Sequence, residues 1–139
     1  MRRILSIILS AAFLMLASQQ LCAQEPQEPD IDEIINNQVE NLAKLYKLDD
    51  VQIFYIDSIL QYNMHGMMDE IEQTRKTGAS SAATFEVISD KWLSATDQAF
   101  ERVFTEDQWK KYMKSAFGKE KKKRDKRISD REAALKISE

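Results

Sequence analysis

Apolar residues recur at three- and four-residue intervals along most of the chain between residues 31 and 117. That spacing places them on one side of an α-helix, whereas a half-buried strand alternates apolar and polar residues. No run shows sustained alternation, and the chain contains only three Gly and two Pro. The pattern therefore predicts an all-α protein.

Four helices are predicted, over residues 31–46, 50–76, 82–103 and 106–118. The apolar stripe of the first helix is Ile31, Ile34, Ile35, Leu42 and Leu45, and that of the second is Ile53, Ile56, Leu60, Met64, Met67 and Ile71. The stripe of the third helix is Phe85, Ile88, Trp92, Ala95, Ala99 and Val103, and that of the fourth is Trp109, Tyr112, Met113, Ala116 and Phe117. We expect the second helix and the third, whose stripe is close to a heptad, to form a long antiparallel hairpin. The stripes are narrow and the chain is short, so we expect a homodimer.

Glycine and short polar residues mark the ends of these helices. Gly78 is expected to follow the end of the second helix, with Ser80 or Ser81 capping the third. Asp30, with Glu33 three residues later, predicts a capping box at the start of the first helix. Gly66 lies in the middle of the second helix, where it predicts a kink or a close approach of a neighbouring helix.

Two short segments match each other and mark the starts of the second and fourth helices. They read Leu48-Asp49-Asp50-Val51-Gln52 and Phe104-Thr105-Glu106-Asp107-Gln108. In each, the N-cap side chain can accept a hydrogen bond from the backbone of the Gln at N3, whose side chain reaches back to the cap. The apolar residue before each cap is expected to pack on N4 as a hydrophobic staple. The structural motif residues are Leu48, Asp49, Gln52, Phe104, Thr105 and Gln108.

A pair of such motifs in a small helical chain resembles the paired LTxxQ segments of the Spy/CpxP family of periplasmic proteins. Asp49 stands in place of the family's Thr, and Phe104 in place of its Leu. The resemblance covers residues 45–112. It implies a thin, curved, four-helix dimer that holds unfolded client proteins without ATP and acts in the envelope-stress response. It also implies a client surface that mixes basic and apolar residues, and some relatives bind zinc.

The N-terminus has the features of a targeting segment. Two arginines precede an apolar run, Ile4–Leu16, and Ala23 supplies a small residue for cleavage. We expect residues 1–23 to be a cleaved signal peptide that exports the protein to the periplasm, with secretion from the cell as an alternative. The run is short for an uncleaved anchor, and the residues before Cys22 lack the small side chains of a lipobox. Cys22 is the only cysteine, so the mature chain has no disulfide to form.

Charge divides the mature chain into an acidic body and a basic arm. Residues 24–109 contain 18 Asp and Glu against 6 Lys and Arg, whereas residues 110–131 contain 3 against 11. We expect a disordered spacer at 24–29, a helical domain at 30–118 and a charged arm at 119–139. The arm is either a frayed helical extension or disordered, with Ser129 and Glu132 able to cap one last turn.

The arm offers cations for anionic lipids, lipopolysaccharide phosphates or acidic client proteins. A solvated tail that balances the acidic body is the alternative, and export argues against nucleic acid as a partner. The candidate partner-binding residues are Lys119, Lys121, Lys122, Lys123, Arg124, Lys126 and Arg127.

A second candidate site is a cluster of potential metal ligands in the second helix: Met64, His65, Met68 and Asp69. Met64 and Met68 are four residues apart, as are His65 and Asp69, so each pair shares a helix face. Thioethers with imidazole suit Cu(I), and carboxylate with imidazole suits Zn(II). The alternative is that Met64 continues the core stripe and His65 is a solvated helix residue, because one helix supplies few converging ligands.

Little in the chain indicates an enzyme. It has one His, no phosphate-binding Gly loop and no nucleophile in a recognisable setting. Acidic residues in the first helical turns serve the helix dipole, and no cofactor is expected. Trp92 is assigned to the core, whereas Tyr55 and Tyr62 fall off the main stripe and are candidates for lining a surface groove.

These patterns favour an exported helical binding protein, and the resemblance to the Spy/CpxP family implies that it is either an ATP-independent chaperone or an envelope-stress interaction module. Two alternatives remain open. One is a periplasmic protein that binds copper or zinc, and the other is a non-catalytic structural partner in an envelope complex.

Overall fold

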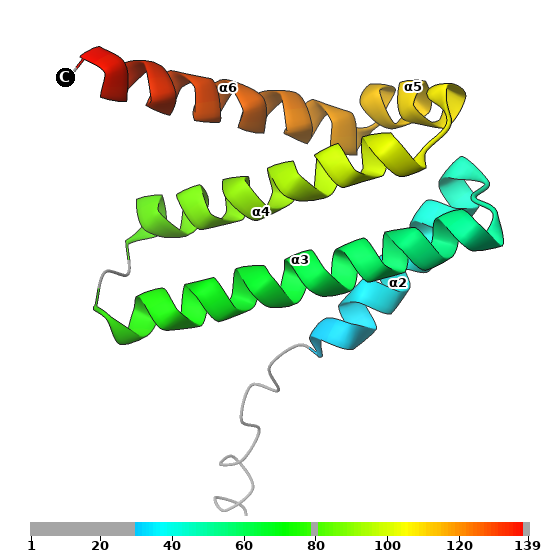
Figure 1. Ribbon diagram of the computed structural model, residues 1–139, viewed down its shortest axis with the longest axis horizontal. Helices are drawn as coiled ribbons and strands as arrows, with labels where there is room; N and C mark the ends of the chain where they lie inside the picture. Colours follow the sequence, from blue (N-terminus) through cyan, green and yellow to red (C-terminus); the bar gives the residue numbers. More distant parts are fainter. Residues whose placement is uncertain (1–29, 79–80, 138–139) are drawn as a thin grey trace, which may run out of the picture.

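A computed structural model of the chain describes residues 30–78 and 81–137. Within these ranges the chain forms helices and no strand, which confirms the all-α class. The helices are α2 (Ile31–Tyr46), α3 (Asp50–Lys76), α4 (Ala82–Val103), α5 (Glu106–Lys114) and α6 (Ala116–Ile137). The expected signal peptide and spacer lie outside the described residues. Figure 1 shows α6, α4 and α3 side by side in that order, with α2 lying across α3.

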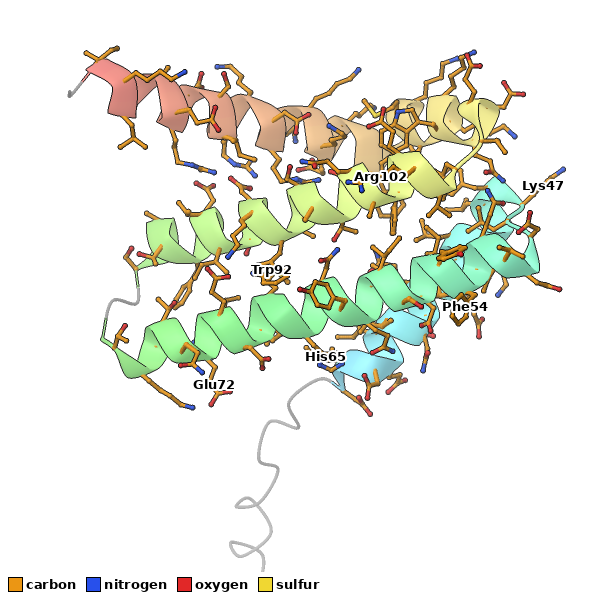
Figure 2. All side chains as sticks on the ribbon, viewed as in Figure 1. Lys47, Phe54, His65, Glu72, Trp92 and Arg102 are labelled. Atoms are coloured by element: carbon orange, nitrogen blue, oxygen red, sulfur yellow. The ribbon has the colours of Figure 1, made fainter. Side chains whose placement is uncertain are left out.

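The two long helices α3 and α4 lie against each other with the chain running in opposite directions (Figure 1). Between them, Asn63 donates a hydrogen bond to Thr96 over 3.0 Å. Trp92 points from α4 toward α3 (Figure 2) and its Nε1 donates to Glu70 over 2.7 Å. A Cβ built on Gly66 would lie 2.4 Å from the Trp92 ring, so glycine gives this ring room against the α3 backbone. Helix α3 runs unbroken through Gly66, so the glycine permits close approach without interrupting the helix.

Most helix ends have the caps that the sequence predicts. Gly78 has a φ of 75° just beyond α3, where glycine adopts the left-handed conformation readily. Ser81 caps α4 by accepting from the Thr84 backbone over 3.1 Å. The capping box expected at Asp30 is wrong, because this side chain accepts from the Asp32 backbone at N2, and not from Glu33 at N3.

The core lies at the end of the molecule where the α2–α3 and α4–α5 turns meet (Figure 1). Aromatic rings make up much of it. Tyr46 at the end of α2 lies 5.3 Å from Phe104 and 5.9 Å from Tyr112, measured between ring centroids. The Tyr112 ring also stacks on Trp109 of its own helix, 5.0 Å away. This packing joins the turns and fixes the angles at which α3 and α5 begin.

The expectation of one fourth helix that stops near Gly118 is wrong. Helix α5 ends at Lys114, and Ser115 adopts an extended conformation before α6 begins. Ser115 accepts from the Tyr46 hydroxyl over 3.2 Å, which ties this break to the core. Gly118 lies inside α6, where a Cβ would be only 2.4 Å from the Met113 backbone, so α6 starts tightly against the end of α5.

The charged arm is a regular helix. Residues 119–137 continue α6 without interruption, so the expected domain boundary at 118 falls inside a helix, and Ser129 occupies a mid-helix position, not a cap. Helix α6 runs back along α4 (Figure 1), and salt bridges between the two helices hold it there. The predicted four helices are therefore five in the described part of the chain.

Candidate interaction surface

Both matched motifs form complete capping boxes. Asp49 accepts from the Gln52 backbone over 2.8 Å, and the Gln52 side chain accepts from the Asp49 backbone over 3.2 Å. At the second motif the corresponding distances are 3.3 Å and 2.8 Å, between Thr105 and Gln108. The staple between Phe104 and Trp109 is present, with ring centroids 6.4 Å apart. Both predicted capping boxes and the staple of the second motif are therefore confirmed.

The two motifs also bind each other, a contact that the local pattern of neither motif predicts. Gln52 Nε2 lies 2.7 Å from Gln108 Oε1, and Gln108 Nε2 lies 3.1 Å from Gln52 Oε1. Gln52 Nε2 also donates to the Val103 carbonyl at the end of α4 over 2.9 Å. Gln108 Nε2 donates to the Tyr46 carbonyl at the end of α2 over 3.2 Å. We call this pair, Gln52 and Gln108, the glutamine joint.

The glutamine joint explains why both N3 positions carry an amide. A glutamate could accept from the cap backbone and complete the box, but it has no N–H to donate across to the other motif. Each glutamine uses its oxygen for its own helix start and its nitrogen for the end of the helix that precedes the other motif. The motifs thus form one joint between two helix pairs.

Two buried aspartates of α4 hold the basic helix α6. Asp97 accepts from Arg124 Nη2, and also from the Tyr112 hydroxyl over 2.5 Å. Asp90, seven residues earlier, accepts from Arg127 over 2.5 Å and from Arg131 over 2.6 Å. Both aspartates are about 1–2% exposed. Burial, followed by the hydrogen bond to Asp97, raises the pKa of Tyr112 well above its ordinary value, so its hydroxyl stays protonated.

We expect acid to loosen α6. The hydrogen bond from Arg127 is the main cause that lowers the pKa of Asp90, against the opposing effect of burial, and Arg131 adds to it. A lowered pKa in the folded state stabilises the fold fully above the unfolded value of about 3.9 and less as pH falls below it. Thermal melts from pH 6 to pH 3 should show Asp90→Asn lowering the Tm by about 5 °C at pH 6, and by less below pH 4.

A matched control for this prediction is Asp130→Asn, which removes an exposed aspartate of α6 that pairs with Lys126 within the same helix. Exposed pairs of this kind contribute little, so its Tm should follow wild type throughout. An Asp90→Asn effect that stays constant down to pH 3 would contradict the titration of Asp90 as the cause.

The structure divides the candidate partner-binding residues between the interior and the surface. Arg124 and Arg127 turn toward α4 and are engaged by Asp97 and Asp90. Lys121, Lys123 and Lys126 pair with acidic residues of α6 itself. Among the described residues, Lys119 and Lys122 make no ion pair. The arginines therefore hold the arm in place, and the candidate residues that stay on its surface are lysines.

The candidate metal ligands do not converge. Met64 packs against the core and lines a pocket, whereas Met68 and Asp69 are exposed. His65 Nε2 lies 3.0 Å from Asp32 Oδ1 of α2 (Figure 2 shows His65 on α3 beside α2). Within residues 30–78 and 81–137, no group of three His, Cys, Asp or Glu side chains is arranged to hold a metal ion. Metal binding stays a prediction, to be tested by Cu(I) and Zn(II) titration of His65→Ala and Met68→Ala. Unchanged affinity in both would rule it out.

Helix α3 carries a line of exposed apolar side chains on the side turned away from buried Ile56 and Leu60. Val51, Tyr55 and Tyr62 are 64%, 52% and 74% exposed. Their spacing of four and seven residues places them on one helix face. Tyr62 meets the Trp92 ring edge-on, with centroids 6.1 Å apart, which links this face to α4. We call these three residues the α3 stripe.

Some of these features have signals in the sequence. Arg124, Arg127 and Arg131 are spaced by three and four residues, so they share one helix face, and arginine is the usual basic residue of a buried ion pair. These two features together indicate an inward face. Their positions off the main stripe predict Tyr55 and Tyr62 as candidates for a surface groove, whereas the sequence places Val51 only within a capping motif.

Comparison of the chain with protein-family models, with curated proteins and with solved structures finds no match. The resemblance to the Spy/CpxP family therefore stays a prediction based on the two motifs. In the described part of the chain, no helix combines the length and apolar character needed to cross a membrane.

Proposed function

We propose that this chain is an exported, non-catalytic binding protein that holds apolar segments of unfolded client proteins on the α3 stripe without ATP. The observation that carries the proposal is the exposure of Val51, Tyr55 and Tyr62 on one face of a long, well-braced helix. Isolated exposed apolar residues are ordinary, but an aligned series that includes two aromatic residues is typical of interaction surfaces.

The chemistry of the α3 stripe suits varied, extended clients. Tyrosine offers a broad apolar ring with a polar tip, so it can contact many sequences without a shaped pocket. The edge-on contact between Tyr62 and Trp92 adds aromatic surface from α4, and Lys91 Nζ lies 5.1 Å from the Trp92 ring centroid. This combination of aromatic and basic groups supports the comparison with the family's chaperone members.

The remaining structure supports this role by keeping the surface rigid. The glutamine joint fixes the start of α3, and the contacts of Trp92 with Gly66 and Glu70 hold its middle against α4. We further propose that the α3–α4 hairpin assembles into a periplasmic homodimer, in which two α3 stripes offer a longer surface to one client. The lysines on the outer side of α6 add electrostatic attraction for acidic clients or lipids.

Aggregation of a reduced, unfolding client protein tests the proposal. The mature chain, without ATP, should suppress light scattering at near-stoichiometric amounts. The double variant Tyr55→Ser/Tyr62→Ser should need about tenfold more protein for half suppression, because each aromatic contact contributes about 0.5–1.5 kcal/mol.

The matched control is Leu45→Ser/Val87→Ser, which removes two apolar residues of comparable exposure, 60% and 46%, from α2 and α4. It should suppress aggregation as well as wild type. Equal loss in both double variants would show that general surface hydrophobicity is responsible. No suppression at any ratio by the wild-type chain would reject the chaperone function and leave a structural partner role.

A further inference from the structure

A single extended residue, Ser115, separates α5 from α6. The sequence around it favours helix, because residues 106–117 contain neither Gly nor Pro and their apolar spacing predicts one helix through this point. The Ser115 hydroxyl donates to the Tyr112 carbonyl over 2.6 Å and accepts from the Tyr46 hydroxyl over 3.2 Å. Two side-chain contacts therefore hold Ser115 extended where the neighbouring sequence favours helix, and a short hinge of this kind is prone to open.

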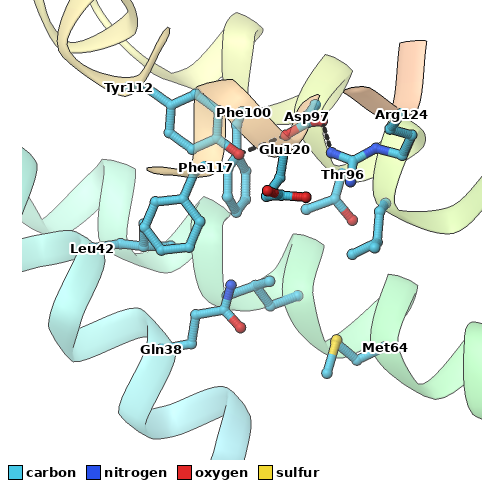
Figure 3. A pocket seen from close by; sticks show the side chains of 12 residues that line it. Gln38, Leu42, Met64, Thr96, Asp97, Phe100, Tyr112, Phe117, Glu120 and Arg124 are labelled. Atoms are coloured by element: carbon cyan, nitrogen blue, oxygen red, sulfur yellow. Dashed lines mark hydrogen bonds and ion pairs between the residues drawn. The ribbon is translucent and has the colours of Figure 1, made fainter. Parts of the chain in front are cut away.

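The break between α5 and α6 brings Tyr112 and Arg124 to the same carboxylate group. Both side chains donate to Asp97, as the dashed lines in Figure 3 show, the Tyr112 hydroxyl over 2.5 Å. In one continuous helix these two residues, twelve positions apart in the sequence, would lie about 18 Å apart along the axis and about a third of a turn apart around it. They could not then both reach Asp97 of the same chain. A continuous α5–α6 helix therefore carries Arg124 away from its own α4.

The contacts that hold α6 on the rest of the molecule are largely polar. Within the described chain, every hydrogen bond between α4 and α6 runs from an arginine of α6 to Asp90 or Asp97. The hydrophobic core cluster includes no residue of α6, and a pocket of about 220 Å³, to which all five described helices contribute, lies beside the first turns of α6. Helix α4 thus recognises α6 by its arginines, and a second copy of the chain carries the same arginines.

An opened chain has a strong need for a partner. Asp90 and Asp97 are 1% and 2% exposed beneath α6, and removing one member of a buried ion pair leaves an uncompensated charge, which is costly. Two chains that open in the same way offer each other the missing groups. Exchange of α6 between them restores every contact between arginine and aspartate, so the exchanged dimer differs from two closed chains mainly at the hinge.

We propose that two copies of this chain exchange α6. In the exchanged dimer, α5 and α6 form one helix through Ser115, and Arg124, Arg127 and Arg131 of each copy bind the aspartates of α4 in the other. Each hinge gains helical hydrogen bonds, since a continuous helix gives the first N–H groups of α6 partners within the preceding turn. The exchange is reciprocal, so the dimer is closed and symmetric.

This exchange is separate from the proposed chaperone function. Helix α6 packs on the side of α4 that faces away from α3 (Figure 1), so the exchanged dimer leaves the α3 stripe exposed. The interface consists of α4 of one copy and α6 of the other, and it depends neither on a client nor on a contact between two α3–α4 hairpins.

A proline at the start of α6 tests the exchange, with the dimer Kd of the mature chain measured by sedimentation equilibrium. Ala116→Pro should keep the closed fold, because proline suits the first position of a helix and the extended backbone of Ser115 suits the residue before it. Proline disrupts the interior of a continuous helix, so the dimer Kd should rise about a thousandfold or more. Glu106→Pro, at the first position of α5, is the matched control and should dimerise as wild type does.

An alanine at the hinge should have the opposite effect. Ser115→Ala removes both side-chain contacts that hold the break, and alanine favours helix, so the dimer Kd should fall by about tenfold or more. Ser129→Ala makes the same substitution at an exposed position in the middle of α6, away from the hinge, and should leave the Kd unchanged.

Crosslinking between copies identifies which α4 each α6 contacts. Arg131 Nη1 lies 3.7 Å from Glu86 Oε2 of α4, and both side chains are partly exposed. Cys22, the only native cysteine, precedes the expected mature chain. One copy therefore carries Glu86→Cys and the other Arg131→Cys, and a short bis-maleimide is added after mixing. Exchange should give a covalent dimer, whereas Leu45→Cys mixed with Arg131→Cys should give none.

Several outcomes would overturn the proposal. A wild-type chain that stays monomeric at every concentration would do so, as would a dimer that Ala116→Pro leaves unchanged, which would place the interface elsewhere. A dimer whose mixture of Glu86→Cys and Arg131→Cys copies yields no covalent product would also contradict it. If circular dichroism shows that Ala116→Pro fails to fold, Ser115→Ala and the crosslinking still decide. No client is used, so this test and that of the chaperone function fail independently.

Discussion

Asp97→Ala is expected to destabilise the fold by about 3–5 kcal/mol, because it leaves a buried arginine without its counter-ion. Arg124 has 8% of its side chain exposed and Asp97 only 3%, so water cannot replace the lost partner. The variant also removes the acceptor of the Tyr112 hydroxyl. Because small domains are stable by only about 5–15 kcal/mol, urea unfolding followed by circular dichroism should show a large fall in midpoint.

Two further variants test whether the loss of stability comes from the unpaired charge of Arg124. Asp125→Ala removes an aspartate of α6 that pairs with Lys121 and is 44% exposed, so its effect should be near zero. The double variant Asp97→Leu/Arg124→Met replaces both charges with apolar groups and should recover more than half of the lost stability. If Asp97→Ala costs less than about 1 kcal/mol, then Asp97 and Arg124 do not form the buried contact that holds α6 on α4.

Gln52→Glu is expected to destabilise the protein by about 2–3 kcal/mol, although glutamate is a standard capping-box residue. Glutamate keeps the acceptor for the Asp49 backbone but cannot donate to the Val103 carbonyl or to Gln108. It also brings a buried negative charge toward carbonyl oxygens. The loss therefore reports the contact between the two motifs and not the helix cap.

The control for this variant is Gln98→Glu, which changes an exposed glutamine of α4 and should be nearly neutral. A double-mutant cycle with Gln52→Ala and Gln108→Ala should give a coupling energy of about 1 kcal/mol or more, since the two amides bond to each other. If Gln52→Glu leaves the free energy of unfolding unchanged, or if the effects of the two alanine variants are additive, then the motifs are two independent helix caps.

Local chemistry made much of the fold predictable. Two helix starts can be predicted from interactions within four residues, between Asp49 and Gln52 and between Thr105 and Gln108. One helix end can be predicted from Gly78, because glycine readily adopts the left-handed conformation that follows a helix. The start of α6 at Ala116 has only a weak local signal, because Ser115 is a common N-cap residue but also occurs within helices. The Ser115 hydroxyl donates to the Tyr112 carbonyl over 2.6 Å and accepts from the Tyr46 hydroxyl, 69 residues away in the sequence, so the break between α5 and α6 combines a local and a distant contact.

The structure of the charged arm also depends on contacts that are distant in the sequence. Its composition suggests a solvated tail, yet residues 119–137 are helical because arginines on one face meet Asp90 and Asp97 of α4. Whether a run of charged residues packs against aspartates of another helix depends on tertiary structure, and the periodicity of the run does not determine it. The pocket beside Arg124 likewise needs side chains from every described helix, so no single segment reveals it.

The most direct test of the central claim is site-specific photo-crosslinking to an unfolding client. A benzophenone amino acid is placed at Tyr62, on the α3 stripe, and separately at Leu45 and Val87, which are also exposed. Illumination during aggregation of a reduced client should give a crosslinked product from position 62 and little from positions 45 and 87. Equal crosslinking at all three positions, or none at position 62, would contradict the account.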